Sequence, residues 1–451
     1  MSRCLTDRIN NVSDGRVLAG DRMNRIFAGA GREEIRLPWN MFPFNEGPNI
    51  WTGIHDMPCV RVVLFENGSR FGFISIEMVF LEAELVAEIK RITSHISGIS
   101  EDNLWVSVTH STSMPHIFER DDDGSEDNPV RKLKGCIVSA TADASKTAAE
   151  SMRPVCFGCG TGYCTVNTNR MIPTKDGWWI GCGEEFPSDH TVPVIRIDDE
   201  AGKPFIIFYN YACELSVMDK SVMRDGGRHI TADLSGAASA IIEKAYNHEV
   251  TAVFLPGPSS DQGPVYKACR VTRGINGTYQ TTDIRDDGWM LLQLAGERLA
   301  EQVLVTAEKI KCSKGEAETF LYCETFTFPG QKLKGLSNPL KAPMKDWESV
   351  PDEDRTRSVE VFRADDLLIV AVGGLSTATV MELKKRSPFE KTIFTESIFG
   401  RAKMLPSDGA KGMADAESYD KGTVHAKNSE FAKGSAEMMK EHILEIFQNL
   451  S

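Results

Sequence analysis

The chain has 451 residues, of which 41% are hydrophobic and 25% are charged, and this composition is typical of a folded protein. Its net charge of −13 argues against nucleic acid or an anionic membrane as the main partner, because both require clustered lysine and arginine. No stretch approaches the roughly 20 apolar residues that span a bilayer, and the first residues lack the apolar core of a secretion signal, so we expect a cytoplasmic protein.

Strand-like runs alternate with helical patterns along the chain, and this alternation predicts an α/β protein. Several strand-like runs are almost continuously apolar, as in strands that are covered on both faces. The expected strands are 59–68, 70–80, 104–110, 191–198, 204–213, 251–257 and 367–374. The expected helices are 81–96, 130–152, 234–248, 289–310 and 435–450. We therefore expect layered mixed β-sheets that are flanked by helices.

Two stretches of the chain show no regular period. Residues 329–358 are rich in proline, lysine and aspartate, so we expect a connection between a main segment, 1–328, and a C-terminal segment, 359–451. Residues 400–430 are polar and contain glycine, which predicts a loop.

Polar side chains stand at the points where apolar strands are expected to end. They are His55, His110, Glu214, Ser259, Ser260 and Asp261. Polar groups at the ends of buried strands can converge on one pocket, where histidine and carboxylates supply metal ligands or acid/base pairs. The alternative interpretation is that each of them caps a strand or a helix.

Eleven cysteines are scattered over the chain, which fits reduced thiols better than a disulfide framework. Cys156, Cys159 and Cys164 lie close together in PVCFGCGTGYC, and Cys182 follows in WWIGCGEE. Four thiols can hold zinc or an iron–sulfur cluster. Because the spacing is loose and the run is rich in glycine, we favour cysteines that act as small apolar fillers of a strand or hairpin.

Other motifs support few chemistries. In DGGRHITADLSG, His229 precedes a helical pattern, and Thr231 or Asp233 is expected to be the helix N-cap. Two tryptophans in KDGWWIG could line an aromatic substrate site or simply pack. The sequence has no P-loop, no GxGxxG after a strand and no GxSxG, so nucleotide-dependent and ordinary α/β-hydrolase chemistries are unsupported.

A series of short segments carries a resemblance to a known family. In chain order they are GIHDMPCVRVVLFENG, FISIEMVFL, ISEDNLWVSVTHSTSMPH, NTNRM, PSDHTVPVIRIDDEAGKPFIIFYNYACELSVM, ITADLSG and AVFLPGPSSDQGP. The series resembles the catalytic domain of the neutral/alkaline non-lysosomal ceramidases, whose signatures include G-(V/I)-H-D, ATHTHSGP, N-x-N-R, NYACHPT and a G-D-x-S/N-P loop. It covers roughly residues 27–265. Residues 365–425 match more weakly, and the family's Ig-like extension has no counterpart here.

The resemblance implies one catalytic domain, completed by the C-terminal segment, and the chemistry of a zinc amidase. His110 matches the first histidine of ATHTHSGP, a zinc ligand in the family. Thr112 stands at the second histidine of that motif, and Glu214 stands at the histidine ligand of NYACHPT. The positions of the family's glutamate and tyrosine ligands fall near Leu375 and Met404, neither of which binds zinc in the usual way.

Substrate contacts are also implied by the resemblance. Arg170 matches an arginine that contacts substrate or stabilises charge, and Asp261 is kept, whereas Gly263 stands where ceramidases have serine. The residues that the resemblance and the strand ends assign to substrate binding are His55, Thr112, Asn167, Arg170, Ser259 and Ser260.

Three hypotheses follow for the altered site. The chain could be an amide hydrolase for a small polar or aromatic substrate, with a divalent metal such as zinc held by His110, Glu214 and recruited ligands such as His116, His229 or Asp261. It could be a metal-free hydrolase, lyase or isomerase that uses His110, Glu214 and Asp261 as acid/base groups, with Cys213 as a nucleophile. It could also be a binding homologue without catalysis. A small molecule is the expected partner, and a homodimer is compatible with the pattern.

Overall fold

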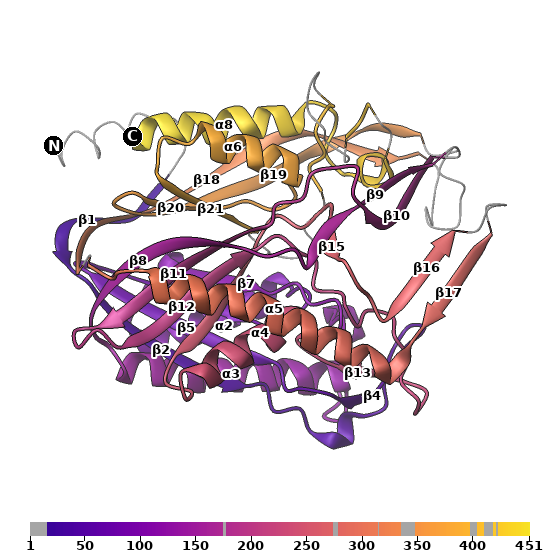
Figure 1. Cartoon of the computed structure of the whole chain (residues 1–451), viewed down its shortest axis with the longest axis horizontal. Helices are drawn as coiled ribbons and strands as arrows, with labels where there is room; N and C mark the ends of the chain where they lie inside the picture. Colours follow the sequence, from indigo (N-terminus) through magenta and orange to yellow (C-terminus); the bar gives the residue numbers. More distant parts are fainter. Residues whose placement is uncertain are drawn as a thin grey trace.

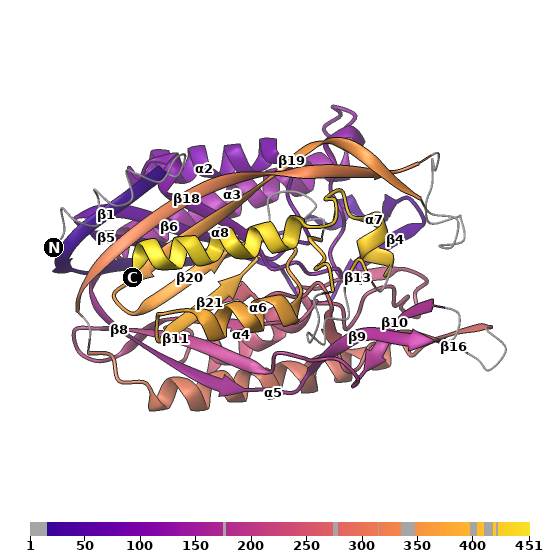
Figure 2. The same cartoon turned by 90° about the horizontal axis from the view of Figure 1, so that it is seen from above.

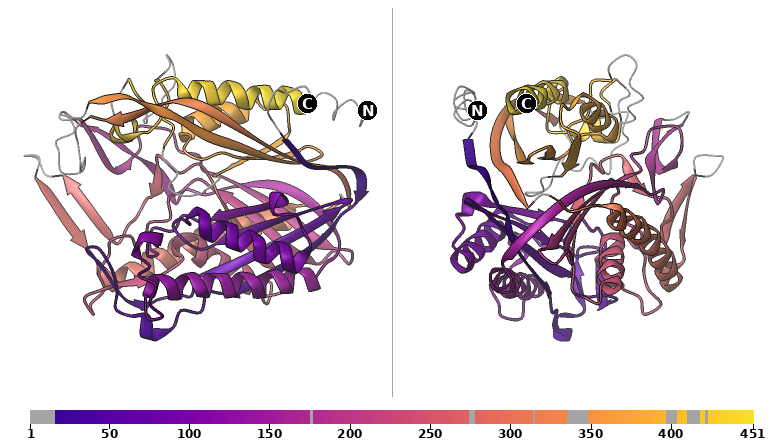
Figure 3. Two further views of the ribbon diagram at one scale, coloured as in Figure 1. Left: turned by 180° about the vertical axis from the view of Figure 1, so that it is seen from behind. Right: turned by 60° about the vertical axis from the view of Figure 1, so that its left-hand side comes forward.

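The structure is a computed structural model that describes residues 16–174, 177–273, 278–313, 315–334, 348–396, 404–409, 418–420 and 423–451. Two large sheets face each other, and helices cover their outer sides (Figure 1). The end-on view shows these layers most clearly (Figure 3, right). Within the described residues, every helix is too short or too polar to cross a bilayer.

The larger sheet has eight strands in the order β14-β12-β11-β8-β2-β5-β6-β7. Its two parallel pairs, β6 with β7 and β12 with β14, lie at opposite edges. The strands are β2 (Phe27–Glu34), β5 (Cys59–Asn67), β6 (Ser69–Ile76), β7 (Leu104–Val108), β8 (Arg153–Tyr163), β11 (Thr191–Asp199), β12 (Pro204–Tyr211) and β14 (Thr251–Pro256).

The second sheet has five strands in the order β1-β18-β19-β20-β21, and α8 lies along its outer face (Figure 2). Its strands are β1 (Arg16–Arg25), β18 (Glu316–Leu333), β19 (Ser349–Ala364), β20 (Leu367–Ala371) and β21 (Lys391–Thr395). The described residues also form three small sheets. The first contains β9 (Asn167–Thr174), β10 (Gly177–Gly183) and β15 (Gln262–Pro264), and the second contains β3 (Phe44–Glu46), β4 (Asn49–Ile54) and β13 (Arg228–Ile230). The third is the pair of β16 (Cys269–Arg273) and β17 (Tyr279–Asp283).

The helices begin and end at residues with a physical reason to do so. At the start of α3, the Asn128 side chain accepts hydrogen bonds from Val130 N and Arg131 N at 2.9 and 3.1 Å, and Pro129 fills the first position. Helix α2 is capped at its C-terminal end by Gly98, whose φ of 70° is a left-handed conformation that glycine adopts readily because it has no Cβ. The helices are α2 (Ala83–Ser97), α3 (Pro129–Glu150), α4 (Asp233–Ala245), α5 (Gly288–Lys309), α6 (Thr377–Arg386), α7 (Val424–Asn428) and α8 (Ser435–Leu450).

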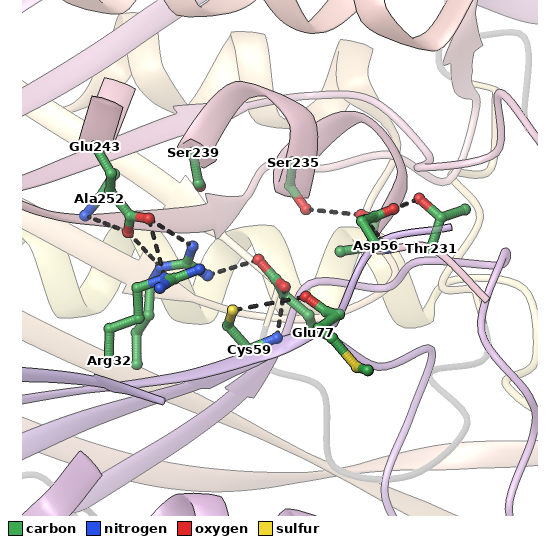
Figure 4. Close-up of polar contacts among 12 residues, drawn as sticks. Arg32, Asp56, Cys59, Glu77, Thr231, Ser235, Ser239, Glu243 and Ala252 are labelled. Atoms are coloured by element: carbon green, nitrogen blue, oxygen red, sulfur yellow. Dashed lines mark hydrogen bonds and ion pairs between the residues drawn. The ribbon is translucent and has the colours of Figure 1, made fainter. Parts of the chain in front are cut away.

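A buried charge network joins the two halves of the larger sheet (Figure 4). The sheet coils so far that β14, at one edge, lies beside β2 and β6. There Arg61 pairs with Glu77 at 2.6 Å and with Glu243 at 3.0 Å, and all three side chains are at most 4% exposed. Glu77 accepts from Cys59 N at 2.7 Å, and Glu243 accepts from Ala252 N at 3.2 Å. Arg32 also pairs with Glu243, at 3.0 Å, so two arginines balance the two carboxylates, and Glu243 satisfies an edge amide of β14.

Between the two large sheets lies an aromatic-rich apolar core that includes Phe73, Phe157 and Phe208. This core leaves a cavity of about 80 Å³.

The predicted layered α/β fold is confirmed, and the predicted strands and helices are found within a few residues of their expected bounds. The predicted connection 329–358 is wrong where it can be compared, because 329–333 lie in β18 and 349–358 lie in β19. These residues pair mainly with each other and are largely exposed, so their composition is polar. Gly330 is required there, since a Cβ would lie 1.8 Å from Glu353 O. The predicted loop 400–430 contains the short helix α7.

Candidate functional site

The loops that follow β7 and β12 lie side by side, although these strands belong to different halves of the sheet. Ser111 forms a parallel bridge with Leu215. Thr112 donates from both its backbone N and its hydroxyl to Leu215 O, at 3.0 Å each. This junction brings the predicted residues His110 and Glu214 to the same region. It also uses the Thr112 hydroxyl, so that Thr112 holds the loops together.

His110 combines backbone strain with a buried, unsatisfied ring atom. Its φ of 63° lies in the left-handed region, which L residues with a bulky side chain seldom adopt. Its ring Nδ1 is buried and has no hydrogen-bond partner among the described residues. Such strain and such unsatisfied polar atoms are concentrated at functional sites in folded proteins. His110 is therefore the residue around which the candidate site is built.

Glu214 forms an ion pair with Arg170 at 2.9 Å, with the two side chains 19% and 14% exposed. Ser216 Oγ donates to the other carboxylate oxygen at 3.0 Å. Burial alone would raise the pKa of Glu214, but the charges of Arg170, Lys267 and His110 lower this pKa to about 2. Glu214 is therefore an anion at every ordinary pH and cannot serve as a proton donor.

Arg170 connects three segments of the chain. Besides its bond to Glu214, its other terminal nitrogen donates to Ser260 O, and its backbone N donates to Asp261 O at 2.9 Å. Arg170 lies on β9, whereas its partner Glu214 follows β12 and its partners Ser260 and Asp261 follow β14. The guanidinium therefore fixes the relative positions of the loops that line the site.

Asp261 is almost fully buried, and its carboxylate is held by three donors. Asn169 Nδ2 reaches one oxygen at 3.1 Å, while Thr377 N and Thr377 Oγ1 reach the other at 3.2 and 2.6 Å. Asp261 thus ties the loop after β14 to β9 and to the start of α6. These bonds fit a positioning residue better than a group that exchanges protons.

The neighbouring serines also hold the loop in place. Ser259 N donates to Glu396 Oε1 at 3.0 Å, and Ser260 Oγ donates to Leu375 O at 3.0 Å. Leu405 N donates to Gly374 O at 2.8 Å, so Leu375 and Met404, which stand at the family's ligand positions, approach the same loop. Their side chains offer no metal ligand of the usual kind.

Asn167 and His55 do not join the His110 group through any contact of the described residues. The amide of Asn167 is fully engaged, since it donates to Asp189 O and Ala212 O and accepts from Tyr211 Oη. His55 lies at the surface, stacked on Trp289 with the ring centroids 3.8 Å apart. Asn167 thus has a structural role, and His55 borders a separate surface groove beside α4 and α5.

The other proposed ligands and nucleophiles are engaged elsewhere. His116 pairs with Glu46 at 2.5 Å, and His229 pairs with Asp225 at 2.8 Å. Burial raises the pKa of Cys213 well above its ordinary value, so its thiol stays protonated and is a poor nucleophile. This raised pKa does not favour Cys213 as the nucleophile.

The cysteines of the sequence cluster lie on different elements, and the two tryptophans contact other aromatic rings. Cys156 and Cys159 lie on β8, Cys164 is buried, and Cys182 is exposed on β10. In the part of the chain that the structure describes, no three His, Cys, Asp or Glu side chains are grouped to hold a metal. Trp178 lies tilted against Phe186, and Trp179 stacks on Tyr279.

The expected helix cap before α4 is replaced by a buried tie. The N-cap residue is Ala232, so the prediction of Thr231 or Asp233 at that position is wrong. Asp233 begins the helix, with a φ of 55°, and accepts from Ser113 Oγ at 2.7 Å and from Val217 N at 3.0 Å. It thereby braces the two loops that carry His110 and Glu214.

We tested whether these side chains fit the zinc ion of the family. His110 Nδ1 offers one vacant donor atom, whereas a catalytic zinc site has three protein ligands. Both Glu214 oxygens are taken by Arg170 and Ser216, and the charge of Arg170 opposes a second cation there. The residues present therefore do not fit a catalytic zinc ion.

Sequence reasoning missed Lys267 and Thr377. Lys267 is half-buried and acts on Glu214 through its charge, and Thr377 holds Asp261. In the sequence, Lys267 is marked only by its place soon after the GPSSDQGP loop. Thr377 is marked only by its place two residues after Leu375, near the position of the family's glutamate ligand. Neither signal is specific without the fold.

Comparison with known proteins was made at the levels of sequence and structure. The sequence matches no protein-family model and no curated protein. The structure is similar to that of a ceramidase complexed with C2, with a TM-score of 0.63 and 12% identity over 94% of this chain and 74% of that chain. It is equally similar to a neutral ceramidase from Pseudomonas aeruginosa, with a TM-score of 0.63 and 12% identity over 95% and 75% of the two chains. The chain therefore has a ceramidase-like fold.

Proposed function

We propose that this chain is a hydrolase that cleaves the amide C–N bond of a small polar or aromatic substrate without a zinc ion. The proposal rests chiefly on His110, whose strained backbone and unpartnered, buried Nδ1 lie beside the Arg170–Glu214 pair. The ceramidase-like fold supports it, as does the resemblance of this loop to the family motif that carries a zinc-binding histidine.

His110 is the acid/base group in this scheme. Nδ1 is buried, so the other ring nitrogen, Nε2, takes a proton from a water molecule, which attacks the carbonyl carbon of the amide. The protonated ring then gives the proton to the departing amine. Glu214 remains ionised throughout, because its pKa is about 2, and it orients Arg170 instead of transferring protons.

The positive charges around Glu214 have a second role. Arg170 and Lys267 direct two positive charges at the Glu214 carboxylate, and the same two charges favour the oxyanion of the tetrahedral intermediate. In this respect Arg170 takes over the electrostatic part of the family's metal ion. A polar substrate with a carboxylate or a strongly polarised carbonyl suits such a surface.

The test is a screen of N-acyl amino acids and aryl amides for release of the free amine. We expect turnover by the wild-type protein in the presence of a chelator, and a loss of about a hundredfold or more in His110→Ala. His95→Ala is the matched control, since His95 is an exposed histidine on α2, and it should keep full turnover.

The outcomes separate the remaining hypotheses. Stoichiometric zinc that is lost in His110→Ala, together with loss of turnover on chelation, would overturn the metal-free scheme. A product formed by elimination or isomerisation in place of hydrolysis would favour a metal-free lyase or isomerase at the same residues. Equal turnover by wild type and His110→Ala would remove the catalytic role of His110.

A further inference from the structure

The glycine-rich strand β8 is in direct backbone contact with the end of α5 and the residues after it. Gly158 and Gly162 lie on the face of β8 that α5 covers. A Cβ on Gly162 would lie 2.5 Å from Thr306 Oγ1, and a Cβ on Gly158 would lie 2.6 Å from Lys311 O. The run of alternate glycines in PVCFGCGTGYC therefore lets the chain after α5 cross β8 at the closest possible distance.

Two thiols meet where this row of glycines ends. Cys156 is the next residue on the same face of β8, because alternate residues of a strand share a face. Cys312 directly follows Lys311, and its Sγ donates to Arg196 O at 3.2 Å. Arg196 is the partner of Gly158 in the sheet, two positions from Cys156. The two thiols lie in hydrogen-bond contact with each other.

The surroundings of this pair favour sulfur chemistry over metal binding. The nearest carboxylate, Asp198, already accepts two bonds from Arg196, at 2.7 and 2.9 Å. The described ranges hold no third ligand that would complete a metal site with the two thiols. Contact between two cysteines far apart in the sequence is the first requirement for a disulfide. Both residues are only half-buried, so a small oxidant can reach them.

We propose that Cys156 and Cys312 form an oxidative modification site, at which an organic disulfide such as glutathione disulfide converts the two thiols into an intramolecular disulfide. One thiolate attacks a sulfur of the oxidant and releases one thiol, which leaves a mixed disulfide on the protein. The second thiolate attacks the protein sulfur of that mixed disulfide and releases the other thiol. The two protons lost by the cysteines end on the two released thiols, so one disulfide is reduced as another forms.

The neighbouring groups make this reaction slow at neutral pH. Burial raises the pKa of both thiols, and the charge of Asp198 raises each pKa further, whereas Arg196 opposes the rise. Only the thiolate attacks a disulfide, so the reaction should be several times faster at pH 9 than at pH 7. The site therefore responds to lasting oxidising conditions.

The disulfide would tie β8 to the connection between α5 and β18. It closes a loop of roughly 160 residues and so restricts the unfolded chain more than the folded one. Oxidation should therefore raise the melting temperature, by about 5 °C. The proposal does not depend on the function assigned to His110, because neither cysteine takes part in that mechanism.

The test is to incubate the full chain with glutathione disulfide at pH 9, block the remaining thiols with N-ethylmaleimide in denaturant, and map the peptides by mass spectrometry. We expect a linked pair of peptides that joins Cys156 to Cys312, and dithiothreitol should release it. Fragmentation distinguishes Cys156 from Cys159, which lies on the same strand. Calorimetry of the oxidised and reduced proteins measures the shift in melting temperature.

Matched variants assign the effect to the two cysteines. Cys156→Ser and Cys312→Ser should each lose the linked peptides and the shift in melting temperature. Cys136→Ser, which changes another half-buried thiol, on α3, should keep both. The map of the wild-type protein stands by itself if a variant does not fold.

Three results would overturn the proposal. Glutathione attached to Cys156 or Cys312 without any link between them would show that the thiols cannot pair. A link from Cys156 to Cys159 or Cys164 would assign the oxidation to another pair. An oxidised protein that melts at or below the temperature of the reduced one would show that the link strains the fold instead of stabilising it.

Discussion

Two buried arginine–glutamate groups in this chain resemble each other in their bonds and differ in their surroundings. Arg61, Glu77 and Glu243 form a closed network in which both carboxylates are held by arginine and by backbone N–H groups. Arg170 and Glu214 are also paired, yet they lie beside a histidine with a left-handed backbone and a buried ring nitrogen without a partner.

The difference shows which feature points to function. Buried ion pairs occur in both places, so burial and pairing alone do not identify a site. Of these two groups, the one around His110 adds backbone strain at a histidine whose buried Nδ1 has no partner among the described residues, and a purely structural role does not explain these costs. We therefore assign Arg61 to the scaffold and Arg170 to the site.

The largest expected effect tests the scaffold role. Arg61→Met leaves Glu77 as a buried, uncompensated charge and Glu243 with Arg32 alone, and should lower the free energy of unfolding by about 3–5 kcal/mol in urea denaturation. Arg91→Met, at a side chain that is 69% exposed, is the control and should change it by less than about 0.5 kcal/mol. A loss below about 1 kcal/mol in Arg61→Met would contradict the scaffold role.

A pH titration sharpens the description of the second group. Because the pKa of Glu214 is lowered to about 2 in the folded state, its ion pair stabilises the protein above the ordinary pKa near 4.5. This stabilisation, about 2–3 kcal/mol, should be lost as the pH falls from about 4.5 to 2. The free energy of unfolding of Glu214→Gln should change less over that range. An identical pH dependence in the two proteins would contradict the lowered pKa.

A third carboxylate provides a contrast, because its charged neighbour is a lysine. Burial raises the pKa of Glu360 on β19 to about 7, against the opposing charge of Lys90. The folded state therefore keeps this proton longer than the unfolded chain, and stability is lost as the pH rises from about 4.5 through 7.

Glu360→Gln tests this sign. It should remove that loss and stabilise the protein by about 2 kcal/mol at pH 8, as measured by denaturation at several pH values. Glu353→Gln, at an exposed position of the same strand, is the control and should leave the pH dependence unchanged. If the free energy of unfolding falls with pH at least as steeply in Glu360→Gln as in the wild type, the pKa of Glu360 is not raised.

The smallest expected change in the free energy of unfolding is that of His110→Gly, a variant that should also lose turnover. His110→Gly relieves a left-handed backbone, with φ of 63°, and should raise the free energy of unfolding by about 0.5–1 kcal/mol while it abolishes turnover. His248→Gly is a closely matched control, since His248 is an exposed histidine with φ of 61°, and it should give a similar gain with turnover intact. Strong destabilisation by His110→Gly would instead make His110 a structural residue.

Much of the fold could be predicted because periodicity is a local signal. The apolar run of β12 and the amphipathic pattern of α8 are visible in the sequence and are found at their expected positions. The ribbon of β18 and β19 was not predictable, since its exposed strands carry polar residues and are stabilised by pairing with each other. The charge network at Arg61 was missed because its members lie on separate elements: Arg61 on β5, Glu77 after β6 and Glu243 on α4.

Residues of the candidate site were predicted only where the order of the family's motifs along the sequence marked them. His110, Glu214, Arg170 and Asp261 were singled out, and the structure places their loops together. His55 lies apart at the surface. Lys267 and Thr377 act across the fold, and a lysine or a threonine in a loop carries no sign of its distant partner.

The junction between Thr112 and Leu215 has a consequence for how the protein folds. These residues are 103 positions apart in the chain, and the loops that they join come from strands in different halves of the sheet. Contacts of such long sequence separation are slow to form, because a large loop must close before any stabilising contact compensates for its lost entropy. Recovery of activity after dilution from denaturant should therefore lag behind recovery of helical circular dichroism.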